Sequence, residues 1–146
     1  GPGAGAALDA LYADSNAKLV AVGDTFADRC TEALDAMLLD EGVGDRVAVE
    51  KDKIFTGFDA YKQVVDSGVD VVLLATPPHF RPEHFEYAVS KDKHCFVEKP
   101  VATDIPGLHR MAAACDVARS KLAVRSGREG NDSADSGWRD RRDSLH

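Results

Sequence analysis

The sequence predicts an α/β fold with a parallel sheet, and three observations support this class. Short apolar segments alternate with segments whose apolar residues recur at helical spacing. The strongest apolar segment, residues 69–75, is almost free of polar residues, which indicates a strand buried on both faces. Hydrophobic residues make up 44% and charged residues 29% of the 146 residues, which is typical of one globular domain.

The elements are expected in alternating order along the chain. Strands are predicted where short apolar segments occur: 18–22, 46–56 (one or two strands), 69–75, 94–97 and 122–124. Helices are predicted where apolar residues recur every three or four positions: 8–12, 27–39, 58–65, 82–89 and 105–115. Pro82 and Pro106 suit the first turn of their helices, and Asp104 is a predicted N-cap. The helix at 27–39 is expected to bury one apolar face, formed by Cys30, Leu34, Met37 and Leu38.

The composition changes abruptly at Arg125. Residues 125–146 are mostly Arg, Asp, Ser and Gly, with only Ala134, Trp138 and Leu145 as apolar interruptions. Such a segment cannot bury enough apolar surface to offset the entropy of ordering it. We therefore predict one folded domain over residues 1–124, followed by a polar disordered tail over residues 125–146.

The net charge limits the partners of the chain. A formal charge of −7 repels phosphate backbones and anionic membranes, and no segment is apolar enough to span a membrane. Nucleic acids and membranes are therefore not expected as partners. Cys30, Cys95 and Cys115 form no C-x-x-C pair, which favours reduced thiols and a cytoplasmic location. The chain opens at Gly1 rather than Met, so any export signal upstream would be missing from it.

The chain opens with small residues at the start of a predicted helix. Gly1, Gly3 and Ala6 fit the pattern G-x-G-x-x-A, in which small residues let the backbone turn tightly and approach a pyrophosphate at the helix N-terminus. Small residues at a chain start also fit a remnant of an expression tag, and Gly-Pro especially does so. The glycines alone leave both explanations open.

Asp24 favours the first explanation. It follows the strand predicted at 18–22, about 20 residues beyond the glycines, where a carboxylate can hydrogen-bond the 2′-hydroxyl of a ribose. The alternative role is an N-cap for the helix that starts near Phe26, and one side chain can serve both roles. With the alternating elements, Asp24 predicts a Rossmann-type doubly wound parallel sheet. Its carboxylate would repel a 2′-phosphate, so NAD is favoured over NADP.

The glycine pattern normally follows a buried strand, but no residue precedes Gly1. In the usual strand order 3-2-1-4-5-6, this first strand lies in the middle of the sheet. We therefore expect the domain at residues 1–124 to lack its first strand and to have two unpaired strand edges.

Two further segments follow predicted strands at the edge where open parallel sheets bind ligands. Thr76, Pro77 and His79 are expected to line the cofactor crevice. Lys99, preceded by Glu98, can place its ammonium group beside a nicotinamide and a substrate hydroxyl, although an exposed salt bridge between the two is the alternative. The histidines match no common metal site in their spacing, so His79, His84 and His94 are expected on polar loop and helix surfaces, with no metal.

The run from Val69 to Pro100 contains A-T-P-P-H-F, H-F-E-Y-A and C-F-V-E-K-P, and it resembles the Gfo/Idh/MocA family of oxidoreductases. The Glu-Lys-Pro triplet at this place is quite specific to that family. The resemblance covers residues 1 to about 124, the nucleotide-binding half of such enzymes, which binds NAD(H) or NADP(H). It implies the following roles: Lys99 contacts nicotinamide ribose and substrate, Glu98 supports the cofactor, Thr76, Pro77 and His79 line the nicotinamide side, and Asp24 selects NAD.

The departures from the family concern the rest of the enzyme. The resemblance implies a second domain that supplies most of the substrate pocket, other catalytic residues and often the oligomer contacts, and we do not expect that domain within these residues. A premature stop or a deliberate shortening would explain this equally. The parent is expected to oxidise a CH–OH group of a sugar or polyol, with Lys99 as the only catalytic residue in this chain, which is expected to be inactive alone. The alternatives are a non-catalytic NAD-binding regulatory module and an NAD-dependent glycoside hydrolase of the same family.

Overall fold

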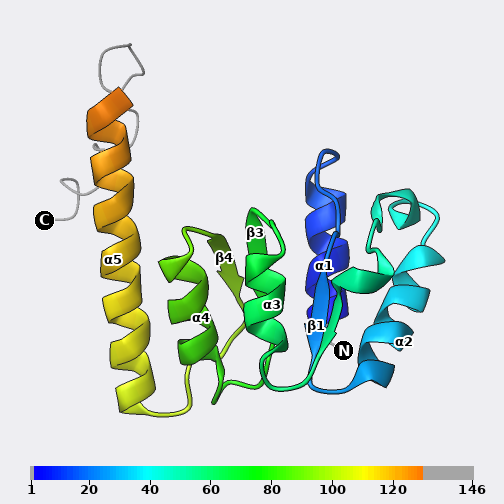
Figure 1. Ribbon diagram of the computed structural model, residues 1–146, viewed down its shortest axis with the longest axis horizontal. Helices are drawn as coiled ribbons and strands as arrows, with labels where there is room; N and C mark the ends of the chain where they lie inside the picture. The colour runs from blue at the N-terminus through cyan, green and yellow to red at the C-terminus, as the bar shows by residue number, and fades with distance from the viewer. Residues whose placement is uncertain (1, 130–146) are drawn as a thin grey trace, which may run out of the picture.

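The computed structural model describes residues 2–129, with side chains up to residue 120. Helices and short strands alternate along this part of the chain, as predicted (Figure 1). The elements are α1 (Pro2–Ala13), β1 (Val22–Asp24), α2 (Ala27–Leu38), β2 (Ile54–Thr56), α3 (Ala60–Asp66), β3 (Val71–Leu74), α4 (Arg81–Ser90), β4 (His94–Val97) and α5 (Ile105–Glu129), with the 3-10 helices η1 (Gly44–Arg46) and η2 (Lys51–Lys53) before β2.

The strands form two parallel pairs. β1 pairs with β2, with Val22 opposite Ile54, and β3 pairs with β4, with Val71 opposite His94. In the usual order of a doubly wound sheet, these are strands 2 and 3 on one side of the first strand and strands 4 and 5 on its other side. Within residues 2–129 no strand joins the two pairs.

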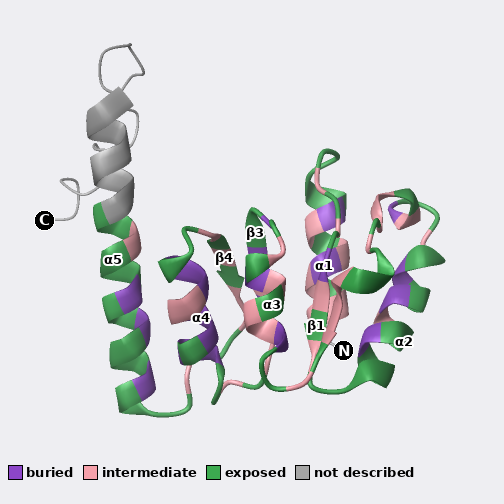
Figure 2. Ribbon diagram, viewed as in Figure 1, coloured by how far each residue is buried: buried purple, intermediate pink, exposed green. Residues whose placement is uncertain are grey.

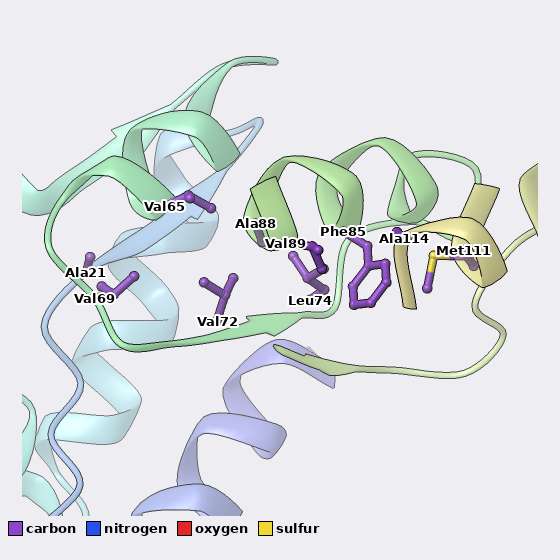
Figure 3. Packing of buried hydrophobic residues seen from close by; sticks show 10 residues of the cluster. All are labelled: Ala21, Val65, Val69, Val72, Leu74, Phe85, Ala88, Val89, Met111 and Ala114. Carbon is purple, nitrogen blue, oxygen red and sulfur yellow. The ribbon is translucent and has the colours of Figure 1, made fainter. Parts of the chain in front are cut away.

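Two apolar cores lie on opposite faces of these strands. The α4-side core joins β3 to α4 and α5 (Figure 3), and its buried members are Ala21, Val65, Val69, Val72, Leu74, Phe85, Ala88, Val89, Met111 and Ala114. The α1-side core joins α1 to α2, and its buried members are Ala7, Leu34 and Met37. Figure 2 shows that residues 105–120 of α5 bury the side that faces α4 and expose the other.

Each strand pair contributes side chains to both cores. In β3, Val72 and Leu74 belong to the α4-side core, whereas Leu73 packs against the α1-side core. In β2, Phe55 packs against the α4-side core and Ile54 against the α1-side core. Side chains alternate between the faces of a strand, so the two pairs are oriented as halves of one sheet with helices on both faces.

Two strand predictions need correction at their limits. The strand expected at 18–22 begins at Val22, and before it Leu19 makes a single bridge with Val47. Regular pairing starts only opposite Ile54, because the chain between that bridge and β2 turns through η2. The segment 69–75 is not buried on both faces, since Val71 is 55% exposed. The α1-side core reaches Leu73 but does not include Val71.

The predictions of a buried Leu38 and of a strand at 122–124 were also wrong. Leu38 is 53% exposed, because α2 turns Cys30, Leu34 and Met37 inward and Leu38 lies beside that face. The strand expected at 122–124 is part of α5, which continues to Glu129. A short apolar run fits either structure, and no glycine or proline interrupts the sequence between Gly107 and Gly127. The helix therefore includes residues 125–129 of the predicted tail, whose remainder lies outside the described residues.

The start of α5 follows the prediction. The Asp104 carboxylate accepts a hydrogen bond from the backbone N–H of Gly107 at 2.7 Å, and Pro106 lies in the first turn. Gly107 is in close contact with its surroundings, because a Cβ there would lie 2.8 Å from Asp104 Oδ1 and 3.3 Å from Pro82 Cγ. The absence of a side chain at this glycine lets the first turns of α4 and α5 approach each other.

Candidate functional site

The strand-to-helix loops all lie at one end of the molecule, at the bottom of Figure 1, because the strands are parallel. The N-terminal end of α1 lies at the same end. Nearly all of the residues that the sequence singled out lie at this edge: Asp24 at the end of β1, Thr76, Pro77 and His79 after β3, and Glu98 and Lys99 after β4. Open parallel sheets bind their ligands at this edge.

The opening glycines are arranged differently from the prediction. α1 already begins at Pro2, so Gly3 and Ala6 lie in the first turns of the helix and form no tight turn before it. Proline is well suited to the first helical position, which explains the early start. Gly1 lies outside the described residues. A Cβ on Gly3 would lie 3.4 Å from the Cβ of Ala75, so the N-terminus of α1 lies against the end of β3. Its free N–H groups and helix dipole favour an anion there.

Asp24 is the last residue of β1, as predicted. Its Oδ1 accepts a hydrogen bond from the backbone N–H of Phe26 at 3.0 Å, and Oδ2 has no hydrogen bond from a described residue. The alternative role as N-cap is not observed, because the N-cap of α2 is Phe26 and it lacks a side-chain cap. Beside Asp24, burial raises the pKa of the Cys30 thiol, and the Asp24 carboxylate raises it further. Because Oδ2 of Asp24 accepts no hydrogen bond from a described residue, this oxygen is available to a ligand hydroxyl.

The loop after β3 is anchored by a buried histidine. The Oγ1 atom of Thr76 lies 3.0 Å from Nδ1 of His84, whose ring stacks on Tyr61 with centroids 3.9 Å apart. Only 7% of His84 is exposed, so the prediction of a polar surface position was wrong for this residue. Burial lowers the pKa of His84, which favours the neutral ring at neutral pH. His79 and Pro77, in contrast, are exposed at the edge.

Glu98 and Lys99 do not form the salt bridge that was the alternative reading. The Glu98 carboxylate instead accepts a hydrogen bond from the backbone N–H of Lys99 at 3.1 Å. The Lys99 side chain is exposed and makes no ion pair with any described residue. The backbone N–H of Glu98 donates to the carbonyl oxygen of Leu74 at 3.0 Å, which continues the β3–β4 pairing up to the loop. The Lys99 ammonium group is therefore presented freely at the edge.

Arg81 is a residue of the site that the sequence analysis missed. It is the first residue of α4 and only 4% exposed, and its guanidinium group donates to three backbone carbonyls of the two loops. One signal in the sequence could have identified it, namely a cation in the first turn of a predicted helix. The helix dipole disfavours a cation at that position, which indicates that the arginine binds other groups.

The histidines are not brought together as metal ligands. His94 begins β4, at the opposite end of that strand from the loops, whereas His79 lies in a loop and His84 is buried. Among the described residues there is no group of three His, Cys, Asp or Glu side chains that could hold a metal ion. The helices within residues 2–129 also include none with the length and apolar character of a membrane span.

Comparison with known proteins identifies the family. Residues 2–126 match the model of the oxidoreductase family with an NAD-binding Rossmann fold, GFO_IDH_MocA. Comparison with curated protein sequences gives no match. Among solved structures, KijD10, a 3-ketoreductase from Actinomadura kijaniata in complex with NADP and TDP-benzene, is 25% identical with a TM-score of 0.54. The match covers 79% of this chain and 30% of that one.

The WlbA dehydrogenase from Bordetella pertussis, in complex with NADH and UDP-GlcNAcA, has the same fold. It is 23% identical with a TM-score of 0.58, and the match covers 89% of this chain and 38% of that one. The chain therefore spans 30% and 38% of the length of these two neighbours.

Proposed function

Because this chain belongs to the oxidoreductase family with the NAD-binding Rossmann fold, we propose that it is the cofactor-binding part of an enzyme that transfers hydride between nicotinamide and a carbon–hydroxyl group of a sugar or polyol. One observation carries the proposal. An available carboxylate oxygen on Asp24, the N-terminus of α1 and the unpaired Lys99 ammonium all lie at the carboxyl edge of the strands.

The residues present fit a dinucleotide in three respects. Asp24 Oδ2 can accept a ribose hydroxyl, and the α1 N-terminus, close to Ala75, can bind the pyrophosphate. In this proposal Thr76, Pro77 and His79 line the nicotinamide side, and the contact between the Thr76 hydroxyl and His84 supports it. We also include Gly1, Gly3, Ala6, Glu98 and Lys99 in this binding set.

The protein supplies binding and proton handling, while bound NAD accepts or returns the hydride. Lys99 is the only residue of this chain that we assign to the chemistry. Its exposed ammonium group has no competing ion-pair partner within the described structure, so it can donate a hydrogen bond to a substrate oxygen. Glu98 keeps its carboxylate on the Lys99 backbone N–H, which shapes the turn beside that ammonium group.

The nature of the substrate is supported by the neighbours. KijD10 is a ketoreductase crystallised with TDP-benzene, and WlbA is a dehydrogenase crystallised with UDP-GlcNAcA. A sugar carried on a nucleotide is therefore the substrate type that we would test first. Because the chain corresponds to 30% and 38% of those two proteins, we propose that a further domain of the parent completes the substrate pocket, and that this chain alone binds the cofactor without turnover.

Thermal unfolding of the chain, alone and with NADH or NADPH, tests the proposal. We expect NADH to raise the melting temperature more than NADPH, because the Asp24 carboxylate would repel the 2′-phosphate of NADPH. A ligand at 100 times its Kd adds about 2.7 kcal/mol to the free energy of unfolding. Asp24→Asn should remove most of the preference for NADH, whereas Asp9→Asn, which changes an exposed acid on α1, should leave it unchanged. Absence of any shift with either cofactor would refute the proposal. Hydride exchange with a free sugar would instead show that the chain is active alone.

A further inference from the structure

Arg81 is a buried cation whose bonding partners are neutral. Its Nε donates to the carbonyl oxygen of Thr76 at 2.6 Å, and its Nη1 donates to the carbonyl oxygens of Glu98 at 2.8 Å and Pro100 at 2.5 Å. It makes no ion pair with any described side chain, although it is only 4% exposed. Burying a charge is costly, and backbone carbonyls offset that cost only where their geometry is well matched.

The position of Arg81 does not serve the helix that carries it. It is the first residue of α4, where the positive end of the helix dipole and the free N–H groups favour an anion over a cation. The benefit of the arginine must therefore come from the groups that it binds. These groups belong to two loops that are far apart in the sequence, after β3 and after β4.

The bonds of Arg81 surround the proposed reaction edge. Glu98 and Pro100 are the two neighbours of Lys99, so one Nη1 atom fixes the backbone on both sides of the lysine while its side chain stays exposed. The same guanidinium group fixes Thr76, whose hydroxyl is in turn oriented by His84. No hydrogen bond of Arg81 reaches β1, which ends at Asp24, or the loop after it.

We propose that Arg81 is a positioning residue that clamps the Thr76 loop to the Lys99 loop and so builds the nicotinamide half of the cofactor site, but not the adenosine half. The inference rests on the proposed function. It adds a residue that does not contact the cofactor itself and acts on it through the backbone carbonyls that it binds, those of Thr76, Glu98 and Pro100. A planar guanidinium fork can bridge the two loops, whereas a single ammonium group has no such geometry.

The test compares two ligands in the full chain. NADH engages both halves of the site, whereas ADP engages only the adenosine and pyrophosphate half. In Arg81→Lys we expect the affinity for NADH to fall about tenfold and that for ADP to stay within about twofold. Arg110→Lys is the matched control, because the guanidinium group of Arg110 also bridges two elements: it donates two hydrogen bonds to the Glu86 carboxylate, on the surface between α5 and α4. It should change neither affinity.

Hydrogen exchange gives a second readout that needs no cofactor. The backbone N–H of Lys99 is bonded to the Glu98 carboxylate, and in Arg81→Lys it should exchange at least about tenfold faster, while the N–H groups of α5 keep their rates. Arg81→Gln is the second variant, in case the lysine is not tolerated.

Three results would overturn the inference. These are unchanged NADH affinity and unchanged Lys99 exchange in Arg81→Lys, equal losses of affinity for NADH and ADP, or loss of cooperative unfolding in both variants. The last two would mean that Arg81 supports the fold as a whole. If the unsubstituted chain binds neither ligand, the proposed function fails, and the exchange of the Lys99 N–H still decides whether the clamp exists.

Discussion

Replacing Gly107 by alanine measures how tightly α5 is seated on α4. In an open helix this change stabilises by about 1 kcal/mol, because alanine is the better helix former. At Gly107, however, the new Cβ would lie 2.8 Å from Asp104 Oδ1, 3.0 Å from the Cβ of Ala102 and 3.3 Å from Cγ of Pro82. The carboxylate cannot move away without weakening its 2.7 Å bond to the Gly107 N–H, and the proline ring is rigid.

The two losses exceed the gain. A lost N-cap costs about 1 kcal/mol, and overpacking costs about 1–3 kcal/mol. We therefore expect Gly107→Ala to lower the free energy of unfolding by about 1–3 kcal/mol, which corresponds to a decrease in Tm of roughly 4–12 °C for a domain of this size. Circular dichroism at increasing temperature or urea concentration measures both quantities.

Gly5→Ala is the control for this reasoning. Gly5 is also helical, but a Cβ there has no neighbour within 4 Å, so only the gain in helix propensity remains. We expect about 0.5–1 kcal/mol of stabilisation. The two substitutions thus have opposite signs. A Gly107→Ala variant that is as stable as Gly5→Ala would show that the α4–α5 contact is looser than described.

Three other predictions concern stability. Met37→Ala, which truncates a residue that is 2% exposed, should cost about 2–5 kcal/mol in urea unfolding, whereas Leu39→Ala, at a position that is 83% exposed, should cost almost nothing. The pKa of buried His84 is lowered, so the unfolded chain binds more protons and stability should decrease as the pH falls below about 6.5; His84→Asn should flatten this part of the pH profile, and an unchanged profile would contradict the assignment. The pKa of Asp40 is lowered chiefly by the hydrogen bond from Tyr12, so the stability that this bond contributes is present above the ordinary carboxyl range and is lost as the pH falls through the lowered pKa. Tyr12→Phe should reduce the loss of stability between pH 5 and pH 2, and an equally steep acid limb would argue against that bond.

Residues that act through their own sequence neighbours were predictable. The helices around Leu34 and Phe85 follow from apolar spacing, and the position of Asp24 at the end of β1 follows from the strand before it. The placement of Thr76 and Lys99 at one edge follows from the parallel order of the strands, since parallel strands bring their carboxyl ends together.

Residues that depend on distant partners were not predictable. His84 looked like a surface residue because its partners, Thr76 and Tyr61, come from a loop and from another helix. The limits of β1 depended on where β2 begins, and the end of α5 depended on the absence of a strand partner for residues 122–124 in the described chain.

The sequence by itself therefore determined the α/β class, the Rossmann order of elements, the family and the edge at which we propose that the cofactor binds, because each follows from local periodicity and from motifs of a few residues. Only the tertiary structure decided that the strands form two pairs, that Gly3 is helical and that Arg81 joins the Thr76 and Lys99 loops. The physical reason is that a hydrogen bond between loops 22 or more residues apart depends on how the strands and helices pack, and no local pattern encodes that distance.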